Sequence, residues 1–435
     1  MNTEVLASEQ LFRRALAVLP GGVSRDTVLR KPHPYYAQSA QGYTVTDVEG
    51  RQYIDFANNM ASLIHGHAFT PIVEAVSKQL LRGTGFTFAT EVEIDFAEHM
   101  CSRSPAFEKI RFMNSGTEAV MAAVKAARAF TGRPKIAKVE GAYHGAYDYV
   151  EISQASGPDR WGSYDAPNAL PLAAGTPQSV ADDVVVIPFN DADAAIRILD
   201  RHGASIAGVL IDPIPHRVGL IPADRAFVDG LQKWTQKKGA LLIFDEVITF
   251  RTEVGGAQSR YKVRPDITAL GKAIGGGFPV GAVAGRSDVM AVFAADKRGL
   301  RLPQSGTFSA NPVTMTAGLV AMKHFDEQAV ARLNRLGEQA RESIREAIKL
   351  AGTSACVTGA GSMFRVHLHA EAPRHYREAF VEGENKARLG RFVDGLLDEG
   401  IMVANTGTGI LSTVMGETQV AILADRVLAS LRRLA

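Results

Sequence analysis

Short runs of apolar residues alternate with helical patterns between about residue 110 and residue 285. Each apolar run is only a few residues long and is typical of a buried strand. Strands that alternate with helices form βαβ units, in which a mainly parallel sheet is covered by helices on both faces. The predicted strands, seven in all, are Ile110–Met113, Lys135–Val139, Val184–Ile187, Ile206–Ile211, Ala240–Phe244, Ile267–Leu270 and Val280–Ala284.

The two ends of the chain show other patterns. Tyr43–Phe56 carries two short runs on either side of Gly50, which predicts a hairpin outside the large sheet. After Asn311 and Pro312, a long helical stretch to about Leu350 leads into a second α+β region. We therefore expect an α/β fold with a large domain over residues 71–313 and a smaller α+β domain formed by residues 1–70 and 314–435.

Composition narrows the class of protein. The 435 residues exceed what one hydrophobic core usually serves, which fits two domains. No apolar run approaches the roughly 20 residues of a membrane span, and the N-terminal segment, an expected amphipathic helix, lacks the apolar stretch of a secretory signal. Two distant cysteines, Cys101 and Cys356, suit a reducing cytoplasm. A net charge of +2 without a basic patch argues against nucleic acid and favours small-molecule partners.

A first candidate site begins after the strand Ile110–Met113. Ser115 and Glu118 have the spacing of a capping box, a common feature that marks the start of a helix. Ser115, Gly116 and Thr117 also place hydroxyls and free backbone N–H groups at the positive helix end, where a phosphate binds well. From this segment alone, a plain helix cap and a phosphate site both stay open.

Two acids directly follow another predicted strand. The apolar run from Ala240 leads into Asp245 and Glu246. Ligands of open α/β sheets bind at the carboxyl ends of strands, which makes Asp245 a site candidate. The alternative is a solvated or salt-bridged loop acid.

Lys272 lies just past the strand Ile267–Leu270 and before Gly275, Gly276 and Gly277. Most single lysines are solvated, but this one lies between apolar strands and beside glycines that permit close approach. Burial would lower the pKa of its amine and make it a nucleophile toward an aldehyde. A phosphate site, a carboxylate and a lysine together suit pyridoxal 5′-phosphate (PLP), which has an aldehyde, a ring nitrogen that pairs with an anion, and a phosphate.

With these motifs the sequence resembles the class III, fold-type I PLP-dependent aminotransferases, nearest the glutamate-1-semialdehyde aminomutase and β-amino-acid aminotransferase group, over nearly the whole chain from Pro20. The resemblance implies that Lys272 forms a Schiff base with PLP and moves protons at the substrate. Asp245 would pair with the ring nitrogen. The remaining implied cofactor contacts are Val247 below the ring, Tyr143 on its other face, and Ser115, Gly116 and Thr117 at the phosphate.

The resemblance also implies a homodimer. In the family a threonine of the neighbouring subunit completes the phosphate site, and Thr307 in QSGTFSANP matches it. Without the resemblance, Thr307 would be an ordinary loop residue. Two further expectations concern the surroundings of the site: His144 shapes the local turn, and Gln154–Asp182 is a long loop that could cover the site.

The chain departs from the family pattern near the expected substrate. In DPIPHRVGLIP, Asp212 replaces a glutamate, and His216 and Arg217 replace a glycine-asparagine pair whose asparagine contacts the phenolic oxygen of the cofactor. Arg217 either lies near the ring as a positive charge or points outward in a salt bridge. Met60 replaces a tryptophan, beside an unusual His65.

Arg25 in PGGVSR matches the position from which β-amino-acid aminotransferases bind the substrate carboxylate, and a guanidinium suits that contact. The alternatives are a surface arginine beside Asp26 and a substrate role for Arg30 instead. The segment 404–412 lacks the acid expected of an aminomutase, which favours a transaminase.

The leading hypothesis is therefore a cytoplasmic, homodimeric aminotransferase that uses PLP to transfer the amino group of a β-amino acid or an aromatic amino acid to a 2-oxo acid. The alternatives are glutamate-1-semialdehyde 2,1-aminomutase, a racemase of the same fold, and a PLP-fold protein that only binds or regulates. No metal, membrane or nucleic-acid partner is expected.

Overall fold

The computed structural model describes residues 6–297 and 299–434. Its largest sheet has seven strands in the order β4-β12-β11-β10-β9-β5-β8. Strand β12 runs antiparallel to its two neighbours, β4 and β11. All other neighbouring strands in this sheet are parallel to each other. The bounds are β4 Lys109–Met113, β5 Lys135–Val139, β8 Val184–Ile187, β9 Ile206–Ile211, β10 Leu241–Asp245, β11 Ile267–Gly271 and β12 Gly281–Gly285. All seven predicted strands are confirmed.

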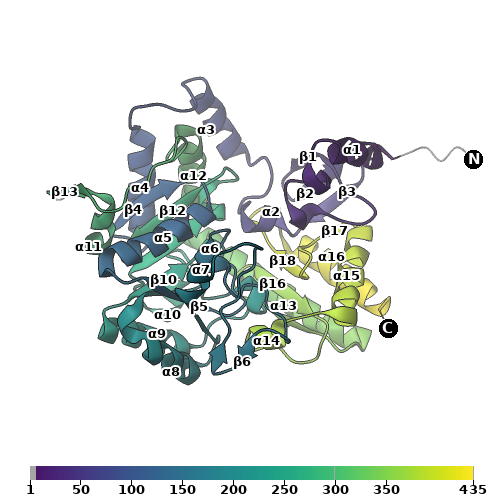
Figure 1. Cartoon of the computed structure of the whole chain (residues 1–435). Helices are drawn as coiled ribbons and strands as arrows, with labels where there is room; N and C mark the ends of the chain where they lie inside the picture. The colour runs from purple at the N-terminus through teal and green to yellow at the C-terminus, as the bar shows by residue number, and fades with distance from the viewer. Residues whose placement is uncertain (1–5, 298, 435) are drawn as a thin grey trace, which may run out of the picture.

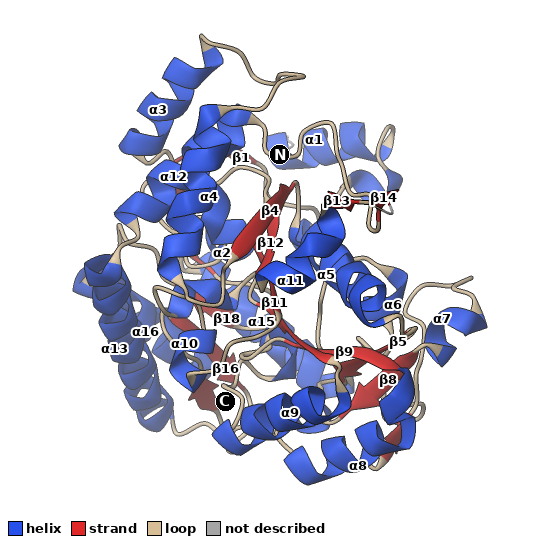
Figure 2. Cartoon of the chain, turned by 90° about the vertical axis from the view of Figure 1, so that its left-hand side faces the viewer, coloured by secondary structure: helices blue, strands red, loops and turns tan. Residues whose placement is uncertain are grey.

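Helices cover both faces of this sheet, because successive side chains of a strand point to opposite faces. Ile243 packs under α5 (Gly116–Thr131), whereas its neighbours Leu242 and Phe244 pack with α8 (Ala192–His202) and α9 (Arg225–Lys238). Figure 2 shows α5 on one side of the red strands and α8 and α9 on the other side. Toward β4, α4 (Glu91–Arg103) and α12 (Pro312–His324) complete the cover. The predicted α/β fold is confirmed.

The smaller α+β part combines both ends of the chain. Strands β1 (Ala37–Gln41), β2 (Thr44–Asp47) and β3 (Gln52–Asp55) pair with β17 (Ile401–Met402) from near the C-terminus. In Figure 1 these purple strands lie beside the yellow C-terminal helices. The C-terminal elements include α13 Glu327–Ala351, β15 Cys356–Thr358, β16 Met363–His367, α15 Gly383–Asp398, β18 Thr408–Ile410 and α16 Glu417–Arg432.

Local details refine the expected elements. The hairpin turns at Gly50, whose φ of 82° is a left-handed conformation that glycine adopts easily. The long helical stretch is two helices, because Asp326 caps α13 by accepting a hydrogen bond from the N–H of Ala329. The helix α1 covers Ala7–Leu16, while residues 1–5 of the expected N-terminal helix lie outside the described residues. None of the helices described is both long and apolar enough to cross a bilayer.

The segment Gln154–Asp182 is more ordered than the expected loop. It contains the two-stranded β6 (Gly162–Ser163) and β7 (Ala166–Pro167), followed by α7 (Gln178–Asp182). The hydroxyl of Tyr376 donates to the carbonyl of Ser156, and the Arg377 guanidinium donates to Gly162. None of the residues of this segment lines the cavity that holds Lys272 in the same chain, and that the segment covers a site stays a prediction.

His65 joins three parts of the chain in the interior. Its Nε2 lies 2.9 Å from the carbonyl oxygen of Ala321, its Nδ1 lies 2.8 Å from the Thr413 hydroxyl, and its ring stacks on Phe69 at 4.6 Å between centroids. The carbonyl only accepts, so Nε2 carries the proton and Nδ1 accepts from Thr413. Burial lowers the pKa of His65 from 6.5 to about 4.

This buried histidine predicts a loss of stability in mild acid. In the unfolded chain the imidazole of His65 binds a proton below about pH 6.5, whereas in the folded chain it does so only below about pH 4. Neutral His65 therefore contributes to the free energy of unfolding above pH 6.5, and this contribution is lost as the pH falls toward 4. When the pH is lowered from about 7.5 to about 5, the free energy of unfolding of the wild type should fall by about 2 kcal/mol more than that of His65→Gln. Thermal or urea unfolding at both pH values measures the difference. His33→Gln, which leaves His65 in place, should follow the wild type, and equal pH dependence of His65→Gln and wild type would contradict the prediction.

Candidate active site

A cavity of about 670 Å³ opens at the carboxyl ends of β4, β9, β10 and β11. Parallel strands bring these ends to one edge of the sheet, so residues far apart in sequence meet there. Ten of the residues proposed from the sequence line this cavity: Arg25, Met60, Ser115, Gly116, Thr117, Tyr143, Arg217, Asp245, Val247 and Lys272.

Lys272 follows β11 directly and has a φ of 48°, so its backbone turns sharply away from the strand. Burial lowers the pKa of its amine, while the carboxylates of Asp245 and Asp212 oppose that shift. Within the described residues, the amine forms no hydrogen bond and no ion pair. It is therefore a largely desolvated amine that is free to react with a carbonyl carbon.

Asp245 ends β10 and is buried. Its Oδ2 lies 2.7 Å from Nδ1 of His144, and its Oδ1 accepts a hydrogen bond of 3.0 Å from the N–H of Val247. Burial lowers the pKa of His144, which favours a neutral ring that donates through Nδ1. These two donors fix the orientation of the carboxylate.

The position of His144 corrects the sequence analysis, which gave this residue only a role in the local turn. Its ring is fully buried against Asp245, 101 residues later in the chain, and its Nε2 has no partner among the described residues. A histidine next to Tyr143 in GAYHG was the available signal, but its partner could not be read from local sequence.

Asp212 adds a second carboxyl group to the cavity wall at the end of β9. Its Oδ1 accepts a hydrogen bond from the N–H of Ile214 at 2.9 Å. Burial, and the nearby negative charge of Asp245, raise the pKa of Asp212 well above its ordinary value. Because the neutral form is favoured, Asp245 is the better candidate to carry the negative charge.

The helix α5 begins at the cavity with Ser115 as its cap. The Ser115 hydroxyl accepts from the N–H of Glu118 at 3.1 Å, as expected, but the Glu118 carboxylate accepts from the N–H of Asn114 instead of that of Ser115. A Cβ on Gly116 would lie 2.8 Å from Cγ1 of Val247. The tight contact explains why glycine is favoured where the start of α5 meets Val247.

Tyr143 and Arg217 lie together on the cavity wall. The Arg217 guanidinium carbon lies 5.3 Å from the centre of the Tyr143 ring, a distance at which the cation is attracted to the ring face. No ion pair of Arg217 occurs among the described residues, so the outward salt bridge considered from sequence is not present. Its positive charge is available to an anion in the cavity.

Thr307 lies apart from these residues. It is exposed and does not line the cavity of its own chain. The adjacent Phe308 is 65% exposed.

The residues present fit PLP. A helix N-terminus with Ser115, Gly116 and Thr117 offers N–H groups and hydroxyls to a phosphate, Asp245 offers an oriented carboxylate to a ring nitrogen, and Lys272 offers an amine without a partner in the described chain. A buried carboxylate near a largely desolvated amine would be costly in an ordinary core, and such a pairing is typical of a functional site.

Comparisons with known proteins agree with this geometry. The pattern of the family described as aminotransferase class-III matches residues 27–427. A glutamate-1-semialdehyde 2,1-aminomutase of Methanothermobacter thermautotrophicus is 39% identical over 399 residues, which cover 92% of each chain.

Two solved structures extend the comparison. An omega-transaminase from Sphaerobacter thermophilus is 46% identical, with a TM-score of 0.95 over 98% of both chains. A β-phenylalanine aminotransferase from Variovorax paradoxus is 32% identical, with a TM-score of 0.85 over 98% of this chain and 93% of the other.

Proposed function

This chain belongs to the class-III aminotransferases, a family of PLP-dependent enzymes, and on that basis we propose that it transfers the amino group of a carboxylate-bearing amino acid, either a β-amino acid or an aromatic amino acid, to a 2-oxo acid. The observation that carries the proposal is the meeting of Lys272, Asp245 and the start of α5 in one cavity whose wall includes Arg25. A reactive amine and a cationic carboxylate anchor together suit an amino acid better than a simple amine.

Bound PLP supplies an aldehyde that condenses with amines and a ring that draws electron density from the carbon bearing the amino group. Residues of this chain perform the cofactor-binding and proton-transfer steps. Lys272 would hold PLP through Nζ, and its free amine would act as the base that moves the proton between the carbon bearing the donor's amino group and the cofactor. Asp245, oriented by His144 and Val247, would keep the ring nitrogen protonated.

Other residues bind and position the reactants. Ser115, Gly116 and Thr117 anchor the phosphate, while Tyr143 and Val247 exclude water from the two ring faces. Arg25 takes the donor carboxylate. Arg217 stands where the family has asparagine and offers positive charge to a carboxylate or to the phenolic oxygen of the cofactor, and Met60 leaves the pocket less crowded than tryptophan would.

The second candidate function is glutamate-1-semialdehyde 2,1-aminomutase. The 39% identity to the Methanothermobacter protein favours it. The transaminase proposal is supported by the higher identity to the Sphaerobacter omega-transaminase and by the absence of an acid in the segment 404–412 of this chain.

A visible-absorbance assay of the purified holoenzyme tests the choice. β-Phenylalanine, phenylglycine, glutamate and glutamate 1-semialdehyde are added singly, and a transaminase should lose the band of its lysine-bound cofactor with an amino donor and regain it on addition of a 2-oxo acid. An enzyme that ignores every amino donor but forms 5-aminolevulinate from the semialdehyde, without an external acceptor, would instead be the aminomutase.

The enzyme is further proposed to be a cytoplasmic homodimer. Thr307 is exposed and stands beside the exposed Phe308, which supports a position at a subunit contact from which Thr307 reaches the phosphate site of the other chain. Sedimentation of the holoenzyme tests the dimer, and weakened cofactor binding by Thr307→Ala tests the shared site.

A further inference from the structure

Four consecutive residues before the His65 loop adopt left-handed backbone conformations. The φ angles are 44° at Asn58, 44° at Asn59, 55° at Met60 and 72° at Ala61. Residues other than glycine rarely adopt these backbone angles, so the surrounding structure must hold the segment in place.

Four hydrogen bonds, to three other residues of the chain, hold this segment in place. Asp55 Oδ1 accepts hydrogen bonds of 2.8 Å from the N–H groups of Ala57 and Asn58. The Asn58 amide donates to the carbonyl of Ile410 at 2.6 Å. The fully buried Arg251, which lies in the short helix η5 (Thr249–Thr252), donates to the carbonyl of Ala61 at 3.4 Å.

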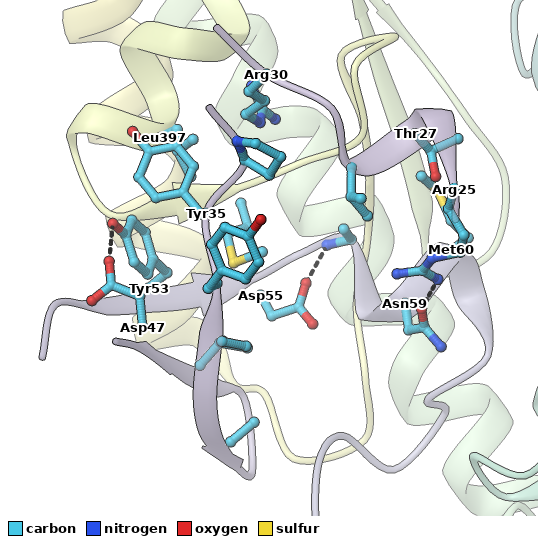
Figure 3. A pocket seen from close by; sticks show the side chains of 18 of the residues that line it. Arg25, Thr27, Arg30, Tyr35, Asp47, Tyr53, Asp55, Asn59, Met60 and Leu397 are labelled. Atoms are coloured by element: carbon cyan, nitrogen blue, oxygen red, sulfur yellow. Dashed lines mark hydrogen bonds between the residues drawn. The ribbon is translucent and has the colours of Figure 1, made fainter. Parts of the chain in front are cut away.

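The anchored backbone presents the side chain of Asn59 to Arg25. Asn59 Nδ2 donates to the Ser62 hydroxyl at 3.1 Å, and that hydroxyl donates to the carbonyl of Asn59 at 2.9 Å. With the amide nitrogen occupied, Asn59 Oδ1 faces the guanidinium and accepts a bond of 2.9 Å from Arg25 Nη1. Figure 3 shows Arg25, Asn59 and Met60 gathered at one end of a neighbouring cavity.

The pair stands where two cavities meet. Arg25, Thr27, Asn59 and Met60 line both the candidate active site and an adjoining cavity of about 800 Å³. No ion pair of Arg25 occurs in the part of the chain that the structure describes. The direction in which Arg25 is held therefore decides whether its charge serves the site of Lys272 or the adjoining space.

We propose that Asn59 is a positioning residue that orients Arg25 for the donor carboxylate and thereby contributes to selection of carboxylate-bearing donors, an inference that rests on the proposed substrate role of Arg25. An amide is suited to this task because it holds one guanidinium N–H without neutralising the positive charge. The remaining N–H groups stay available for a carboxylate in two-pronged geometry. An aspartate at position 59 would instead compete with the substrate.

The test measures binding of 3-phenylpropanoate, a carboxylate without an amino group, to holoenzyme by calorimetry, together with KM and kcat for β-phenylalanine. Asn59→Ala should weaken binding about 3- to 10-fold by releasing Arg25, and Asn59→Asp about 10- to 100-fold by pairing with it. KM should rise by similar factors with a much smaller change in kcat, and the visible band of the lysine-bound cofactor should remain.

Matched variants separate this role from a structural one. Asn405→Ala removes another exposed asparagine of the adjoining cavity, which donates to the carbonyl of Thr27 at 3.3 Å, and should bind within about twofold of the wild type because a solvent-exposed hydrogen bond is weak. Arg25→Ala sets the maximum loss. Wild-type affinity in Asn59→Asp, or equal losses in Asn59→Ala and Asn405→Ala, overturns the inference.

Failure of the proposed function would look different. If the wild type binds 3-phenylpropanoate with the expected ranking of variants but transfers no amino group, the reaction is wrong and the positioning role of Asn59 stands. If Arg25→Ala binds as tightly as the wild type, Arg25 holds no carboxylate and both the substrate assignment and the Asn59 role fall.

Discussion

Replacing Lys272 by alanine is expected to lower turnover by at least about 10⁴-fold, because the variant loses both the nucleophile that holds the cofactor and the base that moves the substrate proton. The same change should abolish the visible band of the lysine-bound cofactor. Lys272 lines the cavity near Asp245, and burial lowers the pKa of its amine, so this residue suits both tasks. Steady-state rates and absorbance spectra of the purified variant measure the two effects.

Two other variants test whether the chemistry of the amine is responsible. Lys272→Arg keeps positive charge and length, but a guanidinium does not deprotonate, so it should be as inactive as alanine. Lys138→Met removes a second buried lysine of the same sheet, whose amine donates to the carbonyls of Val139 and Ile152 at 3.0 and 2.8 Å, and should retain the visible band. Substantial activity in Lys272→Arg would contradict the assignment.

Changing Asp245 to asparagine is expected to lower kcat by about 10²- to 10³-fold, the range for loss of one preorganised electrostatic contact. The amide keeps the shape of the carboxylate and can still accept from His144, but it cannot hold a proton on the ring nitrogen by charge. Cofactor content, the visible spectrum and kcat should be measured together, because an intact lysine-bound band with slow turnover separates an electronic effect from loss of the cofactor.

The neighbouring acid offers a matched control. Glu246 is also buried, and burial raises its pKa to about 8, so its carboxyl group is mainly neutral near pH 7. It accepts from the N–H groups of Ala257 and Gln258 and does not line the cavity. Glu246→Gln should therefore retain kcat within about threefold at some cost in stability. If both substitutions reduced kcat equally, the charge of Asp245 would not be the cause.

Much of the fold could be predicted because it depends on nearby residues. The seven strands of the large sheet follow from short apolar runs, and each was found within one residue of its expected ends. Lys272 and Asp245 stood out for the same reason, since each lies at the carboxyl end of a strand, and the ends of parallel strands share one edge. The seven-stranded order itself, with β12 reversed, required the structure.

The contacts that tune the site could not be predicted from local sequence. His144 meets Asp245 across 101 residues, Arg25 meets Asn59 across 34, and Glu118 bonds to Asn114 instead of completing the expected box. Gln154–Asp182, whose composition predicts a loop, contains two short strands and a helix, and its first part is hydrogen-bonded to residues 376–377.

The family, the order of strands and helices along the chain, and the residues proposed to carry the main chemistry could be predicted, because hydrophobic period and motif spacing are local properties. The partner of His144, the inward position of Arg217 and the amide that faces Arg25 became visible in the folded chain alone. Those contacts form where separate segments meet after packing, and the spacing of two residues along the chain does not give the distance between them in the folded protein.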